Sequence, residues 1–474
     1  MKGLAAAGLA ADGATGTATW VDVAYLVAAI CFIVALKGLS SPRTARRGNL
    51  IGAAGAVLAV AVAFASEHPR NLAAIVAAIA VGAAVGVPAA RRVPMTAMPQ
   101  LVALFNGVGG GAAAVVALLE LGGLDRGVPL VAALFTLVVG SVSFSGSALT
   151  FVKLQELMTG RPVTFPGGPY VFGGLAAVAV GLAAAVYAVG GAGGPAGALA
   201  TATVAVSLLV GVLFVLPVGG ADVPIAISLL NAFTGMTVAA GGYVLQNSLL
   251  LVAGTLVGAA GTLLTRLMAA AMGRSVTSIL FGAFTARAAG PAGSAEQRPV
   301  RSVGPEDVAI QLGYARKVIV VPGYGLAVAQ AQHTVRELAD TLTARGVEVL
   351  YGIHPVAGRM PGHMNVLLAE AEVPYDKLKD MDGINGEFAS ADVALVVGAN
   401  DVVNPAARTS PGAPIFGMPI LNVDQAASVV FLKRSMRPGF AGIENELLYD
   451  RRTALLFGDA KESLSKVLAA VKNS

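Results

Sequence analysis

The sequence of 474 residues carries little charge and a single cysteine. Charged residues make up 12% of the chain, about half the share of a soluble domain, so most of the chain does not face water. Cys31 alone excludes a disulfide within the chain and a cysteine metal site. The first twenty residues lack a basic segment followed by an apolar stretch, so we expect no cleaved signal peptide.

Long apolar runs fill the first 286 residues instead. Hydrophobic residues make up 56% of the chain, and its 59 glycines suit membrane helices, which pack through small residues. A membrane span needs about 20 apolar residues. Nine segments meet this requirement: 22–39, 49–66, 71–90, 98–120, 129–152, 170–190, 198–217, 223–243 and 247–270. The sequence therefore predicts a polytopic α-helical membrane domain over residues 1–286.

Basic residues are concentrated in alternate connections between these spans. They follow spans one, three, five and nine, as Lys37, Arg43, Arg46, Arg47, Arg91, Arg92, Lys153, Arg161, Arg266, Arg274 and Arg287. The seventh connection departs from the pattern and offers only Asp222. The positive-inside rule predicts an outer amino terminus and a cytoplasmic carboxyl end, in the cell (inner) membrane. The net charge of +5 fits this topology and does not indicate a nucleic-acid partner.

The pattern changes after residues 287–307, which form a linker rich in proline, glycine and polar residues. Over 308–474, short β-branched runs alternate with helical stretches. The expected strands are 317–321, 347–351, 391–397, 419–423, 428–432 and 453–457, and the expected helices are 326–345, 363–372 and a last one from about 461. Continuous apolar strands with crossover helices predict a Rossmann-like, doubly wound parallel sheet.

A glycine-rich turn, V-P-G-Y-G-L-A-V-A (321–329), follows the first expected strand. Gly323 and Gly325 allow the backbone to turn sharply and approach a phosphate group. Val328 holds the place of the third glycine of the usual fingerprint, so a glycine turn without a ligand remains the alternative. The second strand ends in Y-G-I-H-P (351–355), without the acid that bonds the ribose of NAD, and this absence permits NADP.

A basic cluster leaves the carboxyl end of a later strand, in F-L-K-R-S (431–435). Lys433, Arg434 and Ser435 place two cations and a hydroxyl at the edge where open α/β sheets bind ligands. This combination suits a dianionic phosphate. A solvated basic strand end is the alternative explanation.

Two further loops, 354–365 and 397–405, carry polar residues. Arg359 can pair with a pyrophosphate. Asp401 lies just past a central strand, where an acid meets a bound ligand. His354 and His363 have no third ligand at a familiar spacing, so we expect no metal site.

Few polar residues lie within the spans. Asn106 is in span four, and Asn231 is in span eight, about 13 Å along the helix axis from Asp222. Amides commonly join helices by hydrogen bonds, and Asp222 can cap its helix. Close helix packing is a sufficient explanation for three glycines on one face of span nine, Gly254, Gly258 and Gly261.

Together these motifs resemble the β subunit of the proton-translocating nicotinamide nucleotide transhydrogenases. The longest matching segments are P-G-Y-G-L-A-V-A-Q-A-Q (322–332), G-I-H-P-V-A-G-R-M-P-G-H-M-N-V-L-L-A-E-A (352–371), G-A-N-D-V-V-N-P-A-A (398–407), F-L-K-R-S-M (431–436) and G-F-A-G-I-E-N (439–445). In the membrane part, M-T-A-M-P-Q-L-V-A-L (95–104), G-G-A-D-V-P (219–224) and S-L-L-N (228–231) match. The resemblance covers essentially the whole chain and implies an NADP(H)-binding domain on a proton channel.

The resemblance also implies roles for individual residues. Hydride would pass from NADH, held by a partner subunit, to NADP⁺ held here, with Asp401 and Tyr324 at the reaction. The implied NADP(H) residues are Gly323, Tyr324, Gly325, Val356, Ala357, Gly358, Arg359, Met360, Pro361, Gly398, Ala399, Asn400, Asp401, Gly417, Met418, Lys433, Arg434, Ser435, Phe440, Asp459 and Ala460. The implied proton-path residues are Asn106, Asp222, Asn231, Gly254, Gly258 and Gly261.

Two residues depart from the family pattern. Asn106 stands where some members have a titratable histidine, so a proton carrier at that depth must come from elsewhere, for example from the partner. Phe440 replaces the usual tyrosine and loses its hydroxyl contact. Because the chain has one nucleotide fold, we expect an α subunit carrying the NAD(H) domain, and a homodimer of the assembled complex. A channel or transporter gated by a nucleotide-sensing domain is the alternative function, although we find no selectivity-filter sequence.

Overall fold

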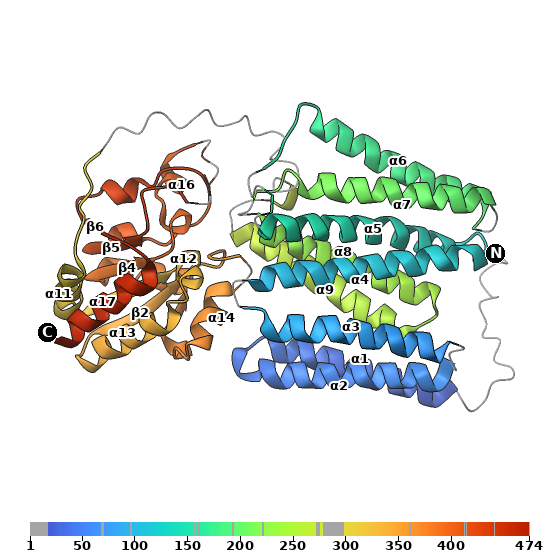
Figure 1. The fold of residues 1–474 in the computed structure, drawn as a ribbon, viewed down its shortest axis with the longest axis horizontal. Coiled ribbons are helices and arrows are strands. Elements are labelled where there is room, and N and C mark those ends of the chain that lie inside the picture. Colours follow the sequence, from blue (N-terminus) through green and yellow to red (C-terminus); the bar gives the residue numbers. More distant parts are fainter. Residues whose placement is uncertain are drawn as a thin grey trace, which may run out of the picture.

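The computed structural model describes residues 18–67, 71–94, 97–155, 157–158, 162–191, 194–219, 222–271, 275–277, 298–359, 362–411, 413, 415–439 and 441–473. Figure 1 shows two parts, a bundle of long helices and an α/β domain at one end of it. This arrangement follows the change of sequence pattern, because the long apolar helices and the short buried strands occupy separate stretches of the chain.

Nine helices of the described residues are long and apolar enough to cross a membrane, which confirms the predicted number of spans. They are α1 (Ala18–Leu39), α2 (Pro42–Glu67), α3 (Leu72–Arg92), α4 (Met98–Glu120), α5 (Val128–Leu154), α6 (Gly168–Val189), α7 (Gly194–Val215), α8 (Val223–Val244) and α9 (Ser248–Ala271). α2 begins seven residues before the predicted span at 49, because its first turns hold Arg46 and Arg47, which remain exposed beyond the apolar stretch.

The helices of the bundle differ in how they pack. α5 lies at the centre and packs against α4, α7 and α8, and α8 pairs closely with α9. α3 has no buried residue. A Cβ atom added to Gly82 or Gly86 of α3 would meet no other group within 4 Å.

Six parallel strands form the sheet of the α/β domain, in the order β3-β2-β1-β4-β5-β6. They are β1 (Lys317–Pro322), β2 (Glu348–Ile353), β3 (Leu378–Asp380), β4 (Val393–Val397), β5 (Ser428–Lys433) and β6 (Thr453–Phe457). The strand order reverses between β1 and β4, and at such a point open α/β sheets have their ligand-binding crevice. The predicted doubly wound parallel sheet is confirmed.

Helices cover the sheet. They are α11 (Pro305–Tyr314), α12 (Tyr324–Val328), α13 (Gln332–Ala344), α14 (His363–Glu370), α15 (Met381–Asn385), α16 (Ala406–Thr409) and α17 (Ala460–Asn473). Side chains that alternate along the strands enter two separate cores, with Val318 and Val320 on one face and Ile319 and Val321 on the other. The apolar residues of the central strands β1, β4 and β5 are thus buried on both faces, as a parallel sheet requires.

The region around the predicted linker, 287–307, is only partly described. Ser302 forms a bridge with Leu455, and α11 begins at Pro305, so the last residues of that range lie against the sheet. Residues 287–297 lie outside the described residues. The domain boundaries at 286 and 308 stay a prediction.

Two local predictions in the α/β domain are wrong. Residues 419–423 do not form a strand, because Pro419 has no N–H and the neighbouring backbone bonds to Asn385 and Val402 instead of a sheet edge. The helix expected at 326–345 is divided into α12 and α13, because Gln330 between them has a positive φ of 49°. A residue in this left-handed region ends a helix.

Candidate functional site

The loops after β1 and β4 touch at the point where the strand order reverses. The N–H of Gly323 donates to the Val397 carbonyl at 2.9 Å, and that of Gly325 donates to the Gly398 carbonyl at 3.0 Å. A Cβ atom on Gly323 would lie 2.4 Å from the backbone of Ala399, and Gly398 has a φ of +70°. Contact between two loops therefore explains these glycines by itself, and it also brings two runs of backbone amides to one crevice.

A chain segment after β5 folds over the residues that follow β4. Asp401 Oδ2 accepts a hydrogen bond from the Ala441 N–H at 2.9 Å. Asn445 Nδ2 donates to the Asn400 carbonyl at 3.2 Å and to its side-chain oxygen at 3.3 Å. Sequence reasoning did not assign Ala441 or Asn445 to the site, although both belong to the G-F-A-G-I-E-N segment.

Lys433 extends from the end of β5 toward the same place. Its Nζ donates to Asn400 Oδ1 at 3.4 Å and to the Arg437 carbonyl at 3.3 Å. Burial lowers the pKa of Lys433, and the negative charge of Asp401 opposes that shift. The structure therefore holds a half-buried cation near the carboxylate of Asp401, in the crevice.

The rest of the predicted phosphate cluster points elsewhere. Arg434 is exposed and forms an ion pair with Asp459 at 2.9 Å, where α17 begins at Ala460. The Ser435 hydroxyl accepts a hydrogen bond from the Arg437 N–H at 3.4 Å. Lys433 thus faces the β4 loop, whereas Arg434 faces the β6 loop, so the three residues do not converge on one point here.

The loop after β2 carries the second cation. The Arg359 guanidinium lies over the Tyr324 ring, 4.3 Å from its centroid, and the Arg359 N–H donates to His363 Nδ1 at 3.0 Å. His363 Nε2 is buried and has no hydrogen-bond partner among the described residues. Burial and the nearby Arg359 charge lower the pKa of His363, which favours its neutral form. Sequence reasoning considered His363 only as a metal ligand and missed this role in placing Arg359.

The same loop reaches the membrane helices. Arg359 Nη1 donates to the Leu154 carbonyl at the end of α5, at 3.2 Å. Val356 packs against Ile225 of α8 and Met268 of α9. Val356 also packs against Met418 in a cluster next to Gly417, whose φ is +83°. The loop after β2 therefore lies against the end of the bundle that faces the α/β domain (Figure 1).

His354 holds the base of this loop. Its Nε2 donates to the Pro419 carbonyl at 2.8 Å, and its Nδ1 accepts from the Val356 N–H at 3.2 Å. Burial lowers its pKa to about 4, against the opposing effect of the Pro419 carbonyl. Both ring nitrogens are thus engaged with the backbone. No group of three potential metal ligands occurs among the described residues.

Three residues assigned to the site, Met360, Pro361 and Phe440, lie outside the described residues. Ala357 is buried within the core beside Met364. Gly358 has a φ of +112°, and a Cβ atom there would lie 2.5 Å from the His363 ring. The turn that carries Arg359 therefore requires glycine at 358.

In the bundle, Asn106 belongs to a chain of hydroxyl groups that joins α4, α5 and α8. Its Nδ2 donates to Ser147 Oγ at 2.9 Å and to Ser143 Oγ at 3.3 Å. Ser143 Oγ lies 2.6 Å from Thr234 Oγ1 and donates to the Leu230 carbonyl at 3.1 Å. Asn106 Oδ1 is buried without a partner among the described residues. The run S-V-S-F-S-G-S at 141–147 was a sequence signal for this network that we did not use.

Asp222 and Asn231 lie on α8, with Asp222 at the end that faces the α/β domain. Asp222 occupies the N-cap position, but its side chain makes no capping hydrogen bond, so the capping explanation is wrong. Ile225, one turn further on, contacts Val356 of the α/β domain. Asn231 is half-buried and lies one turn before Thr234, which belongs to the hydroxyl network.

The three glycines of α9 lie in its interface with α8. A Cβ atom on Gly254 would lie 2.3 Å from Ala239 N, and one on Gly261 would lie 3.0 Å from Ala232. Gly258 is similarly close to Gly235, where an added Cβ would lie 2.4 Å from Gly258 N. The explanation by close helix packing is therefore confirmed for these positions.

Comparison with known proteins agrees with this combination of bundle and sheet. Residues 21–470 match the family model described as NAD(P) transhydrogenase beta subunit. The chain is 46% identical over 464 residues to NAD(P) transhydrogenase subunit beta from Rhodospirillum rubrum, an alignment covering 94% of this chain and 98% of the relative. The protein of the same name from one strain of that species gives the same values. The chain therefore belongs to the NAD(P) transhydrogenase beta subunit family and is a membrane-spanning subunit of an oxidoreductase.

Proposed function

We propose that this chain binds NADP(H) in the crevice between the loops after β1 and β4, and that hydride passes there from NADH held by a partner α subunit. The relatives are named subunit beta, which supports such a partner. Inward proton movement through the helical bundle drives the transfer toward NADPH. The assembled complex is proposed to be a homodimer in the cell inner membrane, with the α/β domain in the cytoplasm.

One observation carries the proposal: the crevice loop that holds Arg359 also contacts the membrane helices. Arg359 Nη1 bonds to the Leu154 carbonyl, and Val356 packs on Ile225, one turn from Asp222. A change at the nucleotide site therefore has a direct mechanical path to the end of α8. A dehydrogenase whose reaction is not coupled to a membrane would not need a contact between its nucleotide site and membrane helices.

The residues present fit NADP(H). The Gly323 and Gly325 amides donate to the β4 loop and so hold the two loops together at the point where open α/β sheets bind ligands, and Lys433 supplies a half-buried cation there for a phosphate. The buried His363 Nε2 lacks a protein partner among the described residues and can donate to a bound oxygen. When bound, NADP(H) supplies the nicotinamide that accepts or gives the hydride. Asp401, held by the Ala441 N–H, is proposed to link that event to protonation.

For the bundle we propose a proton path along Asn106, Asn231 and Asp222, extended by the hydroxyls of Ser143, Ser147 and Thr234. Asn106 does not titrate, so the partner subunit supplies the titrating group beside the buried Asn106 Oδ1. The glycine contact between α8 and α9 keeps the path narrow. One proton crossing about 150 mV releases about 3.5 kcal/mol. This energy shifts the NADPH/NADP⁺ balance by a few hundredfold, at about 1.4 kcal/mol per decade.

Hydride transfer tests the reaction. The purified full chain should bind NADP(H) tightly and should not reduce an NADP⁺ analogue with NADH until the partner subunit is added. NADH-dependent reduction by the chain alone would contradict the two-subunit proposal. Nucleotide-gated ion flux without any hydride transfer would instead support the channel alternative.

Proton pumping in vesicles that contain the assembled complex tests the coupling. Asp222→Asn and Asn231→Leu should each suppress pumping and reverse transhydrogenation, while NADP(H) binding is retained. Asp125→Asn, in the loop between α4 and α5, and Asn49→Leu, on the exposed face of α2, are matched controls that should pump normally. Wild-type pumping by both Asp222→Asn and Asn231→Leu would show that these two residues of α8 do not belong to the proton path.

A further inference from the structure

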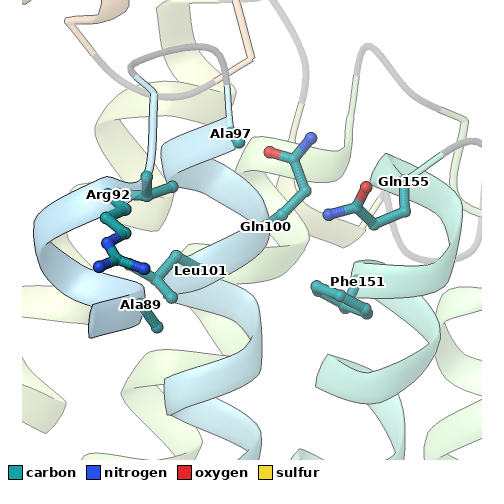
Figure 2. Close-up of a pocket in the computed structure, with 8 residues that line it drawn as sticks. Ala89, Arg92, Ala97, Gln100, Leu101, Phe151 and Gln155 are labelled. Atoms are coloured by element: carbon teal, nitrogen blue, oxygen red, sulfur yellow. The ribbon is translucent and has the colours of Figure 1, made fainter. Parts of the chain in front are cut away.

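A cavity of about 280 Å³ lies between α3, α4 and α5, at the end of the bundle that faces the α/β domain. Figure 2 shows Gln100 of α4 at its centre, with Arg92 of α3 on one side and Gln155 at the end of α5 on the other. Leu101 and Phe151 form its apolar wall. None of these five residues has a part in the proposed hydride site or proton path.

The polar lining of this cavity is incompletely satisfied. Gln100 is 7% exposed, and its Nε2 donates to the Leu154 carbonyl at 3.2 Å. Its Oε1 is buried and has no hydrogen-bond partner among the described residues. An unsatisfied buried acceptor is destabilising, so this oxygen requires a donor that the described protein does not provide. A hydroxyl group that enters the cavity provides one.

Below the polar residues, the space along α3 is open and apolar. α3 has no buried residue, and Gly82 and Gly86 have no neighbour within 4 Å of an added Cβ. On α4, the side chains of Val102 and Phe105 are 48% and 45% exposed. The cavity thus combines a basic and amide-lined mouth with exposed apolar faces of two spanning helices.

We propose that this cavity binds an anionic phospholipid whose headgroup carries a hydroxyl. Arg92 binds the phosphate, and the headgroup hydroxyl donates to Gln100 Oε1. The acyl chains lie along α3 and α4. Basic pockets between membrane helices at one surface bind acidic headgroups in this way, by charge together with hydrogen bonding. A partner helix fits only if its side chains supply both a donor for Gln100 Oε1 and an acid for Arg92, because its backbone donors are already used.

Lipid retention by the purified full chain tests the proposal, with mass spectrometry after exchange into nanodiscs of phosphatidylglycerol or phosphatidylcholine. Wild type should retain phosphatidylglycerol and lose phosphatidylcholine. Arg92→Ala should retain about fivefold less, since one basic residue at a membrane surface contributes about that factor. Arg91→Ala removes the same charge from the neighbouring position, which does not line the cavity, and should behave as wild type.

Two more variants separate the headgroup from the fold. Ala97→Phe fills the cavity and should abolish retention, whereas Ala90→Phe on the exposed surface of α3 should not. Gln100→Leu should reduce the preference for phosphatidylglycerol over phosphatidic acid, which lacks the headgroup hydroxyl.

Several results overturn the proposal. They are equal retention of both lipids, an equal effect of the two arginine variants, and retention that Ala97→Phe leaves unchanged. Binding of free glycerol phosphate as tightly as phosphatidylglycerol would show an anion site without a lipid. Displacement of the lipid when the partner subunit is added would show that a protein helix covers this surface in the complex.

Discussion

Glycine brings backbones together in both halves of this molecule, with different results. Between α8 and α9, a Cβ atom on Gly254 would lie 2.3 Å from Ala239 N. At the sheet edge, one on Gly323 would lie 2.4 Å from Ala399. The first contact is part of the tight interface between α8 and α9, here called the seam, which contains Gly254, Gly258 and Gly261. The second joins the β1 and β4 loops at the reversal of strand order, where open α/β sheets bind ligands.

The surroundings of these contacts explain why the two regions carry different kinds of polar group. In the bundle, buried polar groups such as Ser143 and Asn106 are neutral hydroxyls and amides, because a charge at that depth costs about 2.5–3.5 kcal/mol. At the sheet edge, water and backbone amides support full charges such as Lys433 and Asp401. Close backbone contact is thus common to both regions, whereas ionic chemistry belongs to the edge.

The largest expected effect is steric and concerns the seam. Gly254→Leu should destabilise the purified chain by about 3 kcal/mol or more, because the backbone of α8 must move. Gly82→Leu, on α3 with open space around it, should leave stability unchanged. Thermal unfolding in detergent measures both. Equal stability of the two variants would show that the α8–α9 contact is not tight.

The next effect is a pH dependence confined to the α/β domain. The pKa of His354 is about 4 in the folded chain and about 6.5 when unfolded. The unfolded state therefore binds a proton first as the pH falls below about 6.5, and stability declines until about pH 4, by about 3 kcal/mol in all. In His354→Gln this part of the acid destabilisation should disappear. Denaturant titrations of both chains at several pH values provide the measurement, and parallel pH profiles would contradict it.

A smaller effect concerns the cation in the crevice. Lys433→Ala should weaken NADP(H) binding by roughly ten- to a hundredfold, since a charge-assisted contact contributes about 1.5–3 kcal/mol. NAD(H), without a 2′-phosphate, should lose far less. Lys466→Ala, exposed on α17, is the matched control. Calorimetry on the full chain distinguishes the cases, and an equal loss for both nucleotides would place Lys433 away from the 2′-phosphate.

The smallest effect concerns the exposed pair beside the crevice. Asp459→Asn removes the partner of Arg434, whose side chain is 62% exposed. The stability of the chain should change by less than about 1 kcal/mol, as is typical of surface ion pairs. Chemical denaturation is the measurement. A loss of several kcal/mol would show that the pair contributes much more to stability than an exposed ion pair normally does.

Much of the architecture could be predicted, because it depends on local patterns. Continuous apolar length predicted nine spans, and apolar runs such as 453–457 predicted strands at their observed positions. The strand predicted at 419–423 was wrong, since the backbone hydrogen bonds of a buried apolar run can also be made with side chains, here that of Asn385. The break at Gln330 could not be predicted, because its left-handed backbone has no glycine or proline signal.

The candidate site was predictable as a set of residues but not as a geometry. Gly323, Asp401 and Lys433 stand at strand ends in the sequence, and parallel strands bring such ends to one edge. Nothing local to Arg434 indicated that it pairs with Asp459 rather than pointing into the crevice. Likewise, the sequence around Ser143 did not indicate that its hydroxyl bonds to that of Thr234, 91 residues away.

The sequence by itself determined which part of the chain is apolar enough for a membrane, which part faces water, and that the sheet is parallel. These features follow from local hydrophobicity and its periodicity. Only the tertiary structure decided which groups meet. The bond from Arg359 to the Leu154 carbonyl joins residues 205 positions apart, and the acceptor is a backbone atom that every residue type carries. No sequence pattern encodes such a contact, because it depends on how the bundle and the sheet are placed against each other.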